Sequence, residues 1–201
     1  MKIMNREAYV TDGEYTIFPI SEEDRDDYVE LHRQTNGENS LFLNPVSKDI
    51  MWDATLHGKD KVFSIFDNKG NYCGSIELQN VASCTPEIGI DLLETMRNKG
   101  IAIKAVSMFA RKTYELQSID YFLIRISSKN LHSKHVFEKM GAVKIGEEEN
   151  AFQKFVEAYS EIVTAAENGT EIFKQFFDAE EDETVYQYKL TPEAFKRRVI
   201  L

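Results

Sequence analysis

Residues 87–102 read EIGIDLLETMRNKGIA, and this stretch decides the fold. Its first half alternates polar and apolar residues with the period of a β-strand, so that Ile88, Ile90 and Leu92 share one face. Its second half ends in small residues, with Gly100 close to the start of a predicted helix. A short turn between a strand and a helix leaves backbone N–H groups without partners inside the helix. Because glycine has no Cβ, a phosphate or pyrophosphate can approach those groups closely.

The segments before this stretch predict two helices and an antiparallel part of a sheet. We expect strands at Tyr15–Ile20, Lys61–Phe66 and Tyr72–Gln79, a helix from Ser21 to about Gln34, and a second helix from Ser47 to His57. The turn chemistry of residues 67–71 joins the second and third of these strands into a hairpin. A further strand, Glu87–Leu93, follows the hairpin.

The segments after this stretch alternate between helix and strand. We expect a helix from Asn98 to Leu116, a strand at Tyr121–Ile126, a helix from Leu131 to Met140, a strand at Ala142–Gly146 and a last strand at Thr184–Leu190. Strand–helix–strand order implies a parallel pair of strands with a right-handed crossover. The chain is therefore predicted to be a single α/β domain over residues 1–201, with a central mixed sheet flanked by helices.

A long amphipathic segment lies between the last two strands. Apolar residues recur at helical spacing in two runs, from Phe152 to Ala166 and from Ile172 to Phe177, with Asn168-Gly169 between them. The sequence therefore predicts a helical insert over about residues 150–183. Its role is left open between an extension of the core, a lid over a second substrate, and a contact in a homodimer.

Composition restricts the class of protein. The chain has 201 residues, of which 42% are hydrophobic and 29% charged, as in an ordinary globular domain. A net charge of −10 argues against non-specific binding of nucleic acid and is compatible with a cationic partner such as an amine. No apolar run is long enough to span a membrane, and the N-terminus has no signal core, so we expect a cytoplasmic protein without a membrane partner. Cys73 and Cys84 lie too far apart along the predicted hairpin to form a disulfide, and we expect both to be reduced.

Two short motifs point to one family. The pattern Arg97-x-x-Gly100-x-Ala102 after a strand resembles the acetyl-CoA-binding motif of the GNAT N-acetyltransferase superfamily. The most similar branch contains the ribosomal-protein alanine acetyltransferases. The stretch 130–141, NLHSKHVFEKMG, resembles the second motif of the family. The resemblance implies the GNAT fold from about residue 15 to residue 146 and transfer of acetyl from acetyl-CoA to a primary amine.

The resemblance also implies which residues hold acetyl-CoA. They are Leu92, Leu93, Arg97, Asn98, Lys99, Gly100, Ile101, Ala102, Asn130 and Ser133. In the family, the strand at the first two positions splays from its neighbour and pairs with the pantetheine arm of the cofactor. A backbone N–H near Leu93 is then expected to stabilise the oxyanion, and the first helix and its loop border the acceptor.

The acceptor amine needs a base, because an alkylamine has a pKa near 10 and is mostly protonated at neutral pH. Glu87 lies within about one residue of the position where some family members have a glutamate as general base. Asp91 on the same strand face and Glu77 on the adjacent strand are alternatives, and each of the three is otherwise an ordinary surface acid. We expect Glu87 to be the catalytic base.

The leaving thiolate needs a proton, and many family members supply it from a tyrosine at the position of Phe137. Phenylalanine has no proton to give. In the ribosomal-protein branch a serine often lies near the sulfur at the position of Ser133, one turn after Asn130 on the same helix face. We therefore expect Ser133 to be the acid, with Tyr186 and Tyr188 of the last strand as the next candidates.

Other readings of the sequence remain open. His132 and His135 are spaced to share a metal, but no third ligand is indicated and we expect no metal site. The acceptor is a protein N-terminus, a small amine or an antibiotic amine. The alternative function, prompted by Phe137, is an acyl-CoA-binding module with a sensor or assembly role and little catalysis.

Overall fold

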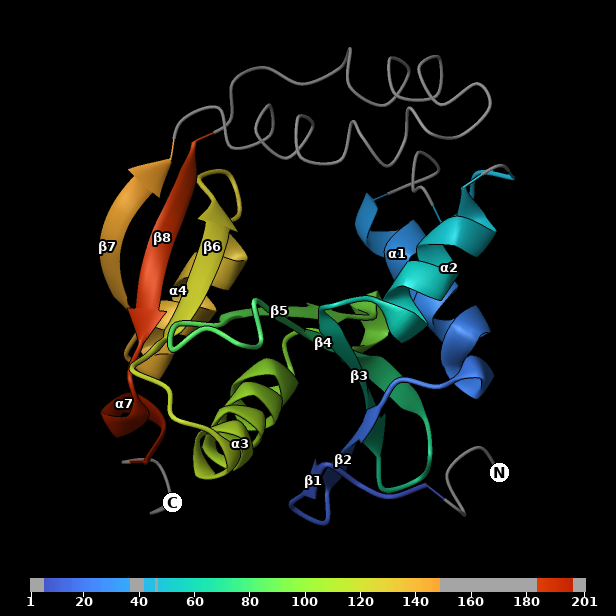
Figure 1. Ribbon diagram of the computed structural model, residues 1–201, viewed down its shortest axis with the longest axis horizontal. Helices are drawn as coiled ribbons and strands as arrows, with labels where there is room; N and C mark the ends of the chain where they lie inside the picture. Colours follow the sequence, from blue (N-terminus) through green and yellow to red (C-terminus); the bar gives the residue numbers. More distant parts are fainter. Residues whose placement is uncertain (1–5, 37–41, 46, 149–183, 197–201) are drawn as a thin grey trace.

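The computed structural model describes residues 6–36, 42–45, 47–148 and 184–196. Within them the chain forms an eight-stranded mixed sheet with helices packed on it (Figure 1). The strands are β1 (Val10–Thr11), β2 (Tyr15–Pro19), β3 (Lys61–Asp67), β4 (Tyr72–Gln79), β5 (Glu87–Leu92), β6 (Phe122–Ser127), β7 (Val143–Glu148) and β8 (Val185–Leu190). The α-helices are α1 (Arg25–Asn36), α2 (Lys48–His57), α3 (Ile101–Leu116), α4 (Leu131–Met140) and α7 (Pro192–Lys196). The predicted α/β class is confirmed.

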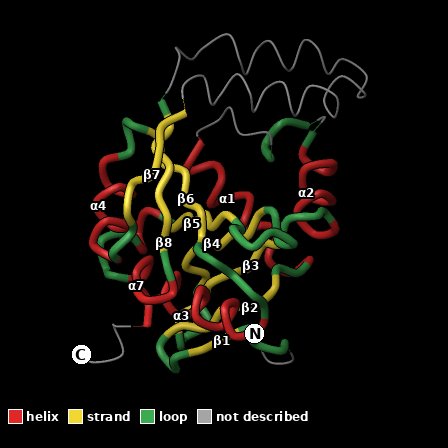
Figure 2. The backbone as a smooth tube through the Cα atoms, turned by 60° about the vertical axis from the view of Figure 1, so that its left-hand side comes forward, coloured by secondary structure: helices red, strands yellow, loops and turns green. Residues whose placement is uncertain are grey.

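The sheet has the strand order β1-β2-β3-β4-β5-β6-β8-β7. Neighbouring strands are antiparallel except β5 and β6, which are parallel and joined through α3, so the predicted parallel pair is confirmed. Figure 2 shows α4 and α7 beside the β6–β8 part of the sheet, whereas α2 packs against β3 in the other half. The predicted helical insert lies outside the described residues.

Two helical layers cover opposite faces of the sheet. On one face, α3 packs against alternate residues of the strands, and the ring of Phe109 lies 4.8 Å from that of Phe63. On the other face, α1 and α2 cover the residues in between. There Leu31 packs with Phe66, and Trp52 packs with Val62. The alternation along the strands therefore gives the sheet two apolar faces, each with its own helices.

The start of α1 is fixed by the fully buried carboxylate of Asp24. It accepts hydrogen bonds from the Ser21 N–H at 3.1 Å, from the Ser64 hydroxyl at 2.8 Å and from the Arg6 guanidinium at 2.7 and 2.9 Å. The predicted pairing of Ser21 with Asp24 at this helix start is present. A buried carboxylate needs such partners, because desolvation of an unpaired charge is costly.

Some boundaries differ from the prediction. The helix expected from Asn98 begins at Ile101, because Asn98 and Gly100 have left-handed φ angles of 60° and 76° that a helix excludes. The short elements β1 and α7 were not predicted. Cys73 is buried, Cys84 is exposed, and both are free thiols, as expected. Among the described residues, no helix combines the length and apolar character needed to cross a bilayer.

Candidate active site

The strands β5 and β6 separate from each other along their length (Figure 1). Their ladder has a single register pair, Glu87 with Leu123, and the Leu123 N–H donates to the Pro86 carbonyl at 2.9 Å. Past this point β5 stays paired with β4 as far as Leu92, while β6 pairs with β8. The splay expected at Leu92–Leu93 is therefore present, and it leaves the β6-facing edge of β5 accessible.

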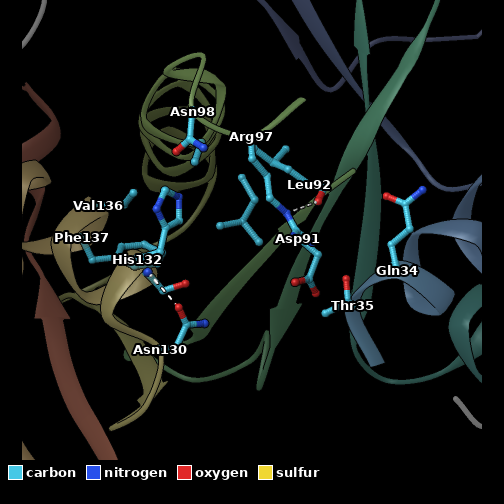
Figure 3. A pocket seen from close by; sticks show the side chains of 13 residues that line it. Gln34, Thr35, Asp91, Leu92, Arg97, Asn98, Asn130, His132, Val136 and Phe137 are labelled. Atoms are coloured by element: carbon cyan, nitrogen blue, oxygen red, sulfur yellow. Dashed lines mark hydrogen bonds between the residues drawn. The ribbon is translucent and has the colours of Figure 1, made fainter. Parts of the chain in front are cut away.

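A pocket of about 360 Å³ opens at this splay, and residues from α1, β5, the turn after β5, α3 and the start of α4 line it (Figure 3). The lining residues are Gln34, Thr35, Ile90, Asp91, Leu92, Arg97, Asn98, Ala102, Asn130, His132, Ser133, Val136 and Phe137. Six of the predicted cofactor residues are among them, from β5, the turn, α3 and α4. Four others, Leu93, Lys99, Gly100 and Ile101, lie next to these in sequence but do not line the pocket.

The turn before α3 presents backbone groups to a ligand. Asn98 and Ala102 line the pocket on either side of Gly100, and the first intrahelical bond from this end is the Lys104 N–H to the Gly100 carbonyl at 3.2 Å. The preceding N–H groups of α3 therefore have no acceptor within the helix. A Cβ added at Gly100 would meet nothing within 4 Å, so the space before this helix end is open. Exposed amides and open space at a helix N-terminus fit the pyrophosphate of acetyl-CoA.

Arg97 attaches this turn to the end of β5. Its Nε donates to the Leu92 carbonyl at 3.0 Å, as the dashed line in Figure 3 shows. Backbone groups of successive strand residues point to opposite sides, and the Leu93 N–H donates to the Cys73 carbonyl on β4 at 3.0 Å. The N–H of Leu93 is therefore already paired within the sheet, which leaves the neighbouring N–H groups as candidates for the oxyanion donor expected near Leu93. By the same alternation, the main chain of Leu92 faces the pocket.

The carboxylate in the pocket is that of Asp91. Its side chain is partly buried, and burial raises its pKa, while the positive charge of Arg97 acts in the opposite direction. Glu77, on the same sheet face of β4, also has a raised pKa, caused first by burial and further by the charges of Asp60, Asp91 and Glu87. Glu77 does not line the pocket.

Glu87 occupies a different place. Both of its carboxylate oxygens accept hydrogen bonds from Arg125 Nε, at 2.9 and 3.0 Å, and it does not line the pocket. Asp91 lies four residue steps further along the strand, which is about 13 Å at roughly 3.3 Å per residue. The geometry therefore does not favour the predicted role of Glu87 as base, because its carboxylate is held by β6 at the closed end of the splay.

The first turns of α4 form the opposite wall of the pocket. Asn130 is the N-cap of this helix, and its Oδ1 accepts a hydrogen bond from the Ser133 N–H at 3.0 Å (Figure 3). Ser133 and the buried Phe137 both line the pocket. The hydroxyl of Tyr188 donates a hydrogen bond to Glu138 at 3.1 Å. Neither Tyr188 nor Tyr186 lines the pocket. Of the three predicted acids, Ser133, Tyr186 and Tyr188, Ser133 is therefore the one that lines the pocket.

Three further residues of the pocket were missed or assigned differently from the sequence. Gln34 and Thr35 come from the last turn of α1, and Gln34 Oε1 accepts the Glu94 N–H at 2.9 Å, which links α1 to the turn after β5. His132, considered only as a metal ligand, also lines the pocket. The only sequence signal for the α1 residues was the general expectation that the first helix borders the acceptor.

Comparison with protein families identifies the class. Residues 14–143 match the acetyltransferase (GNAT) domain family, which is well over half of the chain. The chain therefore belongs to that family. GNAT acetyltransferases use acetyl-CoA, so the protein is an acetyltransferase with acetyl-CoA as its cosubstrate.

Solved structures show the same fold at low sequence identity. A spermidine N-acetyltransferase from Vibrio cholerae, in complex with CoA and spermine, has a TM-score of 0.66 at 14% identity, over 92% of this chain and 99% of that chain. A protein provisionally assigned as a phosphinothricin N-acetyltransferase has a TM-score of 0.61 at 16% identity, over 88% and 98%. No curated protein matches the chain in sequence. The branch of ribosomal-protein alanine acetyltransferases is not confirmed by these comparisons.

Proposed function

We propose that the protein transfers acetyl from acetyl-CoA to a small aliphatic primary amine, with Asp91 as the general base. The observation that carries this proposal is the carboxylate of Asp91, which lines the pocket at the splay of β5 and β6 beside the main chain of Leu92. An ammonium group with a pKa near 10 must lose a proton before it can attack a thioester. A carboxylate whose pKa is raised by burial is a stronger base than an exposed one, which suits this step.

Three parts of the pocket fit acetyl-CoA, which supplies a thioester for direct attack by the amine: the start of α3, the main chain of Leu92 and Asn130. The amides at the start of α3, with Asn98 and Gly100, would bind the pyrophosphate. The pocket-facing main chain of Leu92 would pair with the pantetheine arm, and the N–H of this residue is the donor for the oxyanion. Asn130 would contact the arm from the N-terminus of α4. No step needs a covalent intermediate on the protein.

Proton transfers complete the reaction. Asp91 accepts the proton that the ammonium loses, directly or through one water, and the neutral amine attacks the carbonyl carbon. The bond from carbon to sulfur then breaks, and the Ser133 hydroxyl gives its proton to the leaving thiolate. The acetylated nitrogen loses its extra proton, which passes through water to the Ser133 oxygen, and Asp91 releases its own proton to solvent. Gln34 and Thr35, on the α1 side of the pocket, border the acceptor.

Two observations support a small aliphatic amine as the acceptor. The chain carries a net charge of −10, which favours a cationic substrate. The similar structure from Vibrio cholerae contains spermine, an aliphatic amine. A protein N-terminus is the second candidate, because a serine at the position of Ser133 resembles the ribosomal-protein branch.

The test measures release of free thiol from acetyl-CoA with spermidine, with a peptide that begins with alanine, and without an amine. We expect turnover that depends on the amine and is faster with spermidine. Asp91→Asn keeps the shape of the side chain and should lower kcat/KM by about 10²-fold or more at neutral pH. Turnover by this variant at the wild-type rate would remove Asp91 from the mechanism.

A binding module with little catalysis is the second candidate function, and Phe137 favours it because the pocket lacks the tyrosine of many relatives. Tight binding of acetyl-CoA without thiol release for any amine would establish this alternative. If catalysis occurs, Ser133→Ala should lower kcat by about 10²-fold, the usual scale for one general acid. Phe137→Tyr in that background should recover part of the rate, because it places a hydroxyl in the same pocket.

A further inference from the structure

A second cavity of about 610 Å³ lies along α3 and extends to β1. Figures 1 and 2 show α3 and β1 next to each other, on the side of the sheet where α3 packs. The cavity has no lining residue in common with the pocket at the splay of β5 and β6. Its volume is in the range of small-molecule sites, roughly 300–1,000 Å³.

The lining of this cavity is positively charged although the protein is acidic. Four cationic side chains, Lys104, Arg111, Lys112 and Lys139, line it together with the carboxylates of Asp12 and Glu115. The lining therefore has a formal charge of 4 − 2 = +2, in a chain whose net charge is −10. The carboxylate of Asp12 also accepts hydrogen bonds from the N–H groups of Glu14 and Tyr15, at 2.9 and 2.7 Å. These bonds in the β1–β2 turn partly compensate its negative charge.

Two of the four cations are not paired within the described part of the chain. Lys104 forms an ion pair with Glu14, but neither Arg111 nor Lys112 has a hydrogen bond or ion pair with any described residue. The Nε of Arg111 is buried and has no acceptor in the described structure. A buried donor without a partner costs free energy, and most such groups in proteins are paired with another protein group, water or a ligand.

We propose that this cavity binds a small organic phosphate, such as a nucleotide, that is a separate molecule from acetyl-CoA. Several cations that line one cavity suit a multiply charged phosphate better than a single carboxylate, and the planar fork of arginine matches phosphate oxygens. Val10, Ile103 and Met108 provide apolar lining for the rest of the ligand. The site is additional to acetyl transfer.

The test is calorimetric titration of the full chain, saturated with CoA, using ADP as the probe. We expect ADP to bind with about one molecule per chain and more weakly as salt is added, because charged contacts are screened. Adenosine, which has no phosphate, should not bind measurably. The double variant Arg111→Gln/Lys112→Gln should bind ADP at least about tenfold more weakly, the scale of one lost charge-assisted hydrogen bond.

A matched control removes the same charge elsewhere. Lys59→Gln/Lys69→Gln neutralises two exposed lysines outside the cavity and should leave ADP binding within about twofold, under 0.5 kcal/mol. The proposal is overturned if ADP fails to bind the CoA-saturated protein, if CoA and ADP compete, or if both double variants bind ADP equally. If the first double variant fails to fold, Lys112→Gln alone replaces it, and unchanged ADP affinity in that variant has the same meaning.

Discussion

At the scale of single residues, the proposed chemistry depends on two acids of β5 whose surroundings differ. Asp91 lines the pocket and has a raised pKa because it is partly buried. Glu87 accepts two hydrogen bonds from Arg125 and lies outside the pocket. Strand alternation places both side chains on one face, so their positions along the strand and their partners decide which of them meets an amine.

The raised pKa of Asp91 predicts a dependence of stability on pH. The folded chain binds this proton more tightly than the unfolded chain, so stability falls as pH rises from the ordinary value, about 3.9, through the raised value. Asp91→Asn lacks this fall. Relative to the wild type, the free energy of unfolding of the variant should therefore rise across that window and keep a constant excess above it. Urea unfolding measures this from roughly pH 3, below the ordinary pKa, to about pH 8.

The control for this measurement is Asp120→Asn, which changes an exposed aspartate on the loop before β6. Its difference from the wild type should not grow with pH as the difference of Asp91→Asn does. A difference for Asp91→Asn that stays flat, or that falls with rising pH, would contradict the burial of this carboxylate in the folded protein.

Gly100 gives a second prediction at this scale. Gly100→Glu places a carboxylate and a Cβ where the pyrophosphate should lie, so acetyl-CoA should no longer stabilise the protein. The wild type should gain about 2.7 kcal/mol at a hundred times the dissociation constant. Gly13→Glu is the matched control, because Gly13 also has a positive φ, 85°, and open space around an added Cβ.

Both glycine variants should lose about 1–2 kcal/mol of stability, because a left-handed φ is strained for other residues. Only Gly100→Glu should lose the stabilisation by acetyl-CoA, as measured by thermal unfolding with and without the cofactor. Equal stabilisation of both variants by acetyl-CoA would show that the turn before α3 does not bind it.

The sequence predicted the residues around the cofactor better than the residue that could act as base. The motif residues Arg97, Asn98, Ala102, Asn130 and Ser133 line one pocket because short spacings fix their positions at two helix starts. The proposed base was harder to predict, because the choice between Glu87 and Asp91 depends on Arg125, a residue of another strand. Contacts between distant segments of this kind leave no local pattern in the sequence.

At the scale of elements, the splay of β5 from β6 forms the site. The two strands are held together where Glu87 meets Arg125, and they diverge beyond that point. The parallel arrangement followed from the strand–helix–strand order. The start of α3 was predicted three residues too early, because the left-handed φ of Asn98 could not be foreseen from its type.

This arrangement predicts a structural role for Glu87. Glu87→Gln should weaken the ion pair with Arg125 and lower the free energy of unfolding by at most about 1 kcal/mol, since the pair is partly exposed. The same variant should change kcat/KM by less than about threefold. A loss of about 10²-fold with a shift in the acidic limb of the pH profile would instead identify Glu87 as the base.

At the scale of the whole molecule, two helical layers and a divided sheet bring α1, β5, α3 and α4 to one pocket (Figure 1). The insert predicted over residues 150–183 lies outside the described residues, so its helices and the homodimer contact that it could provide stay predictions. Analytical ultracentrifugation of the full chain tests the dimer. The cytoplasmic location also stays a prediction.

The proposed binding of both substrates in one pocket predicts sequential kinetics. Direct attack on the thioester requires acetyl-CoA and the amine to be bound together, so initial-rate lines at different amine concentrations should intersect. Parallel lines, the pattern of a ping-pong mechanism, would require an acetylated protein and contradict direct transfer.

The central claim is that acetyl transfer takes place where β5 and β6 diverge. The most direct test is a crystal structure of the Asp91→Asn variant with acetyl-CoA bound. We expect the pyrophosphate at the first turn of α3, the pantetheine arm along β5, and the acetyl carbonyl within hydrogen-bond distance of the Leu92 N–H, beside residue 91. Electron density that places the acetyl group outside this splay, or more than about 6 Å from residue 91, too far for a bridge through one water, would contradict it.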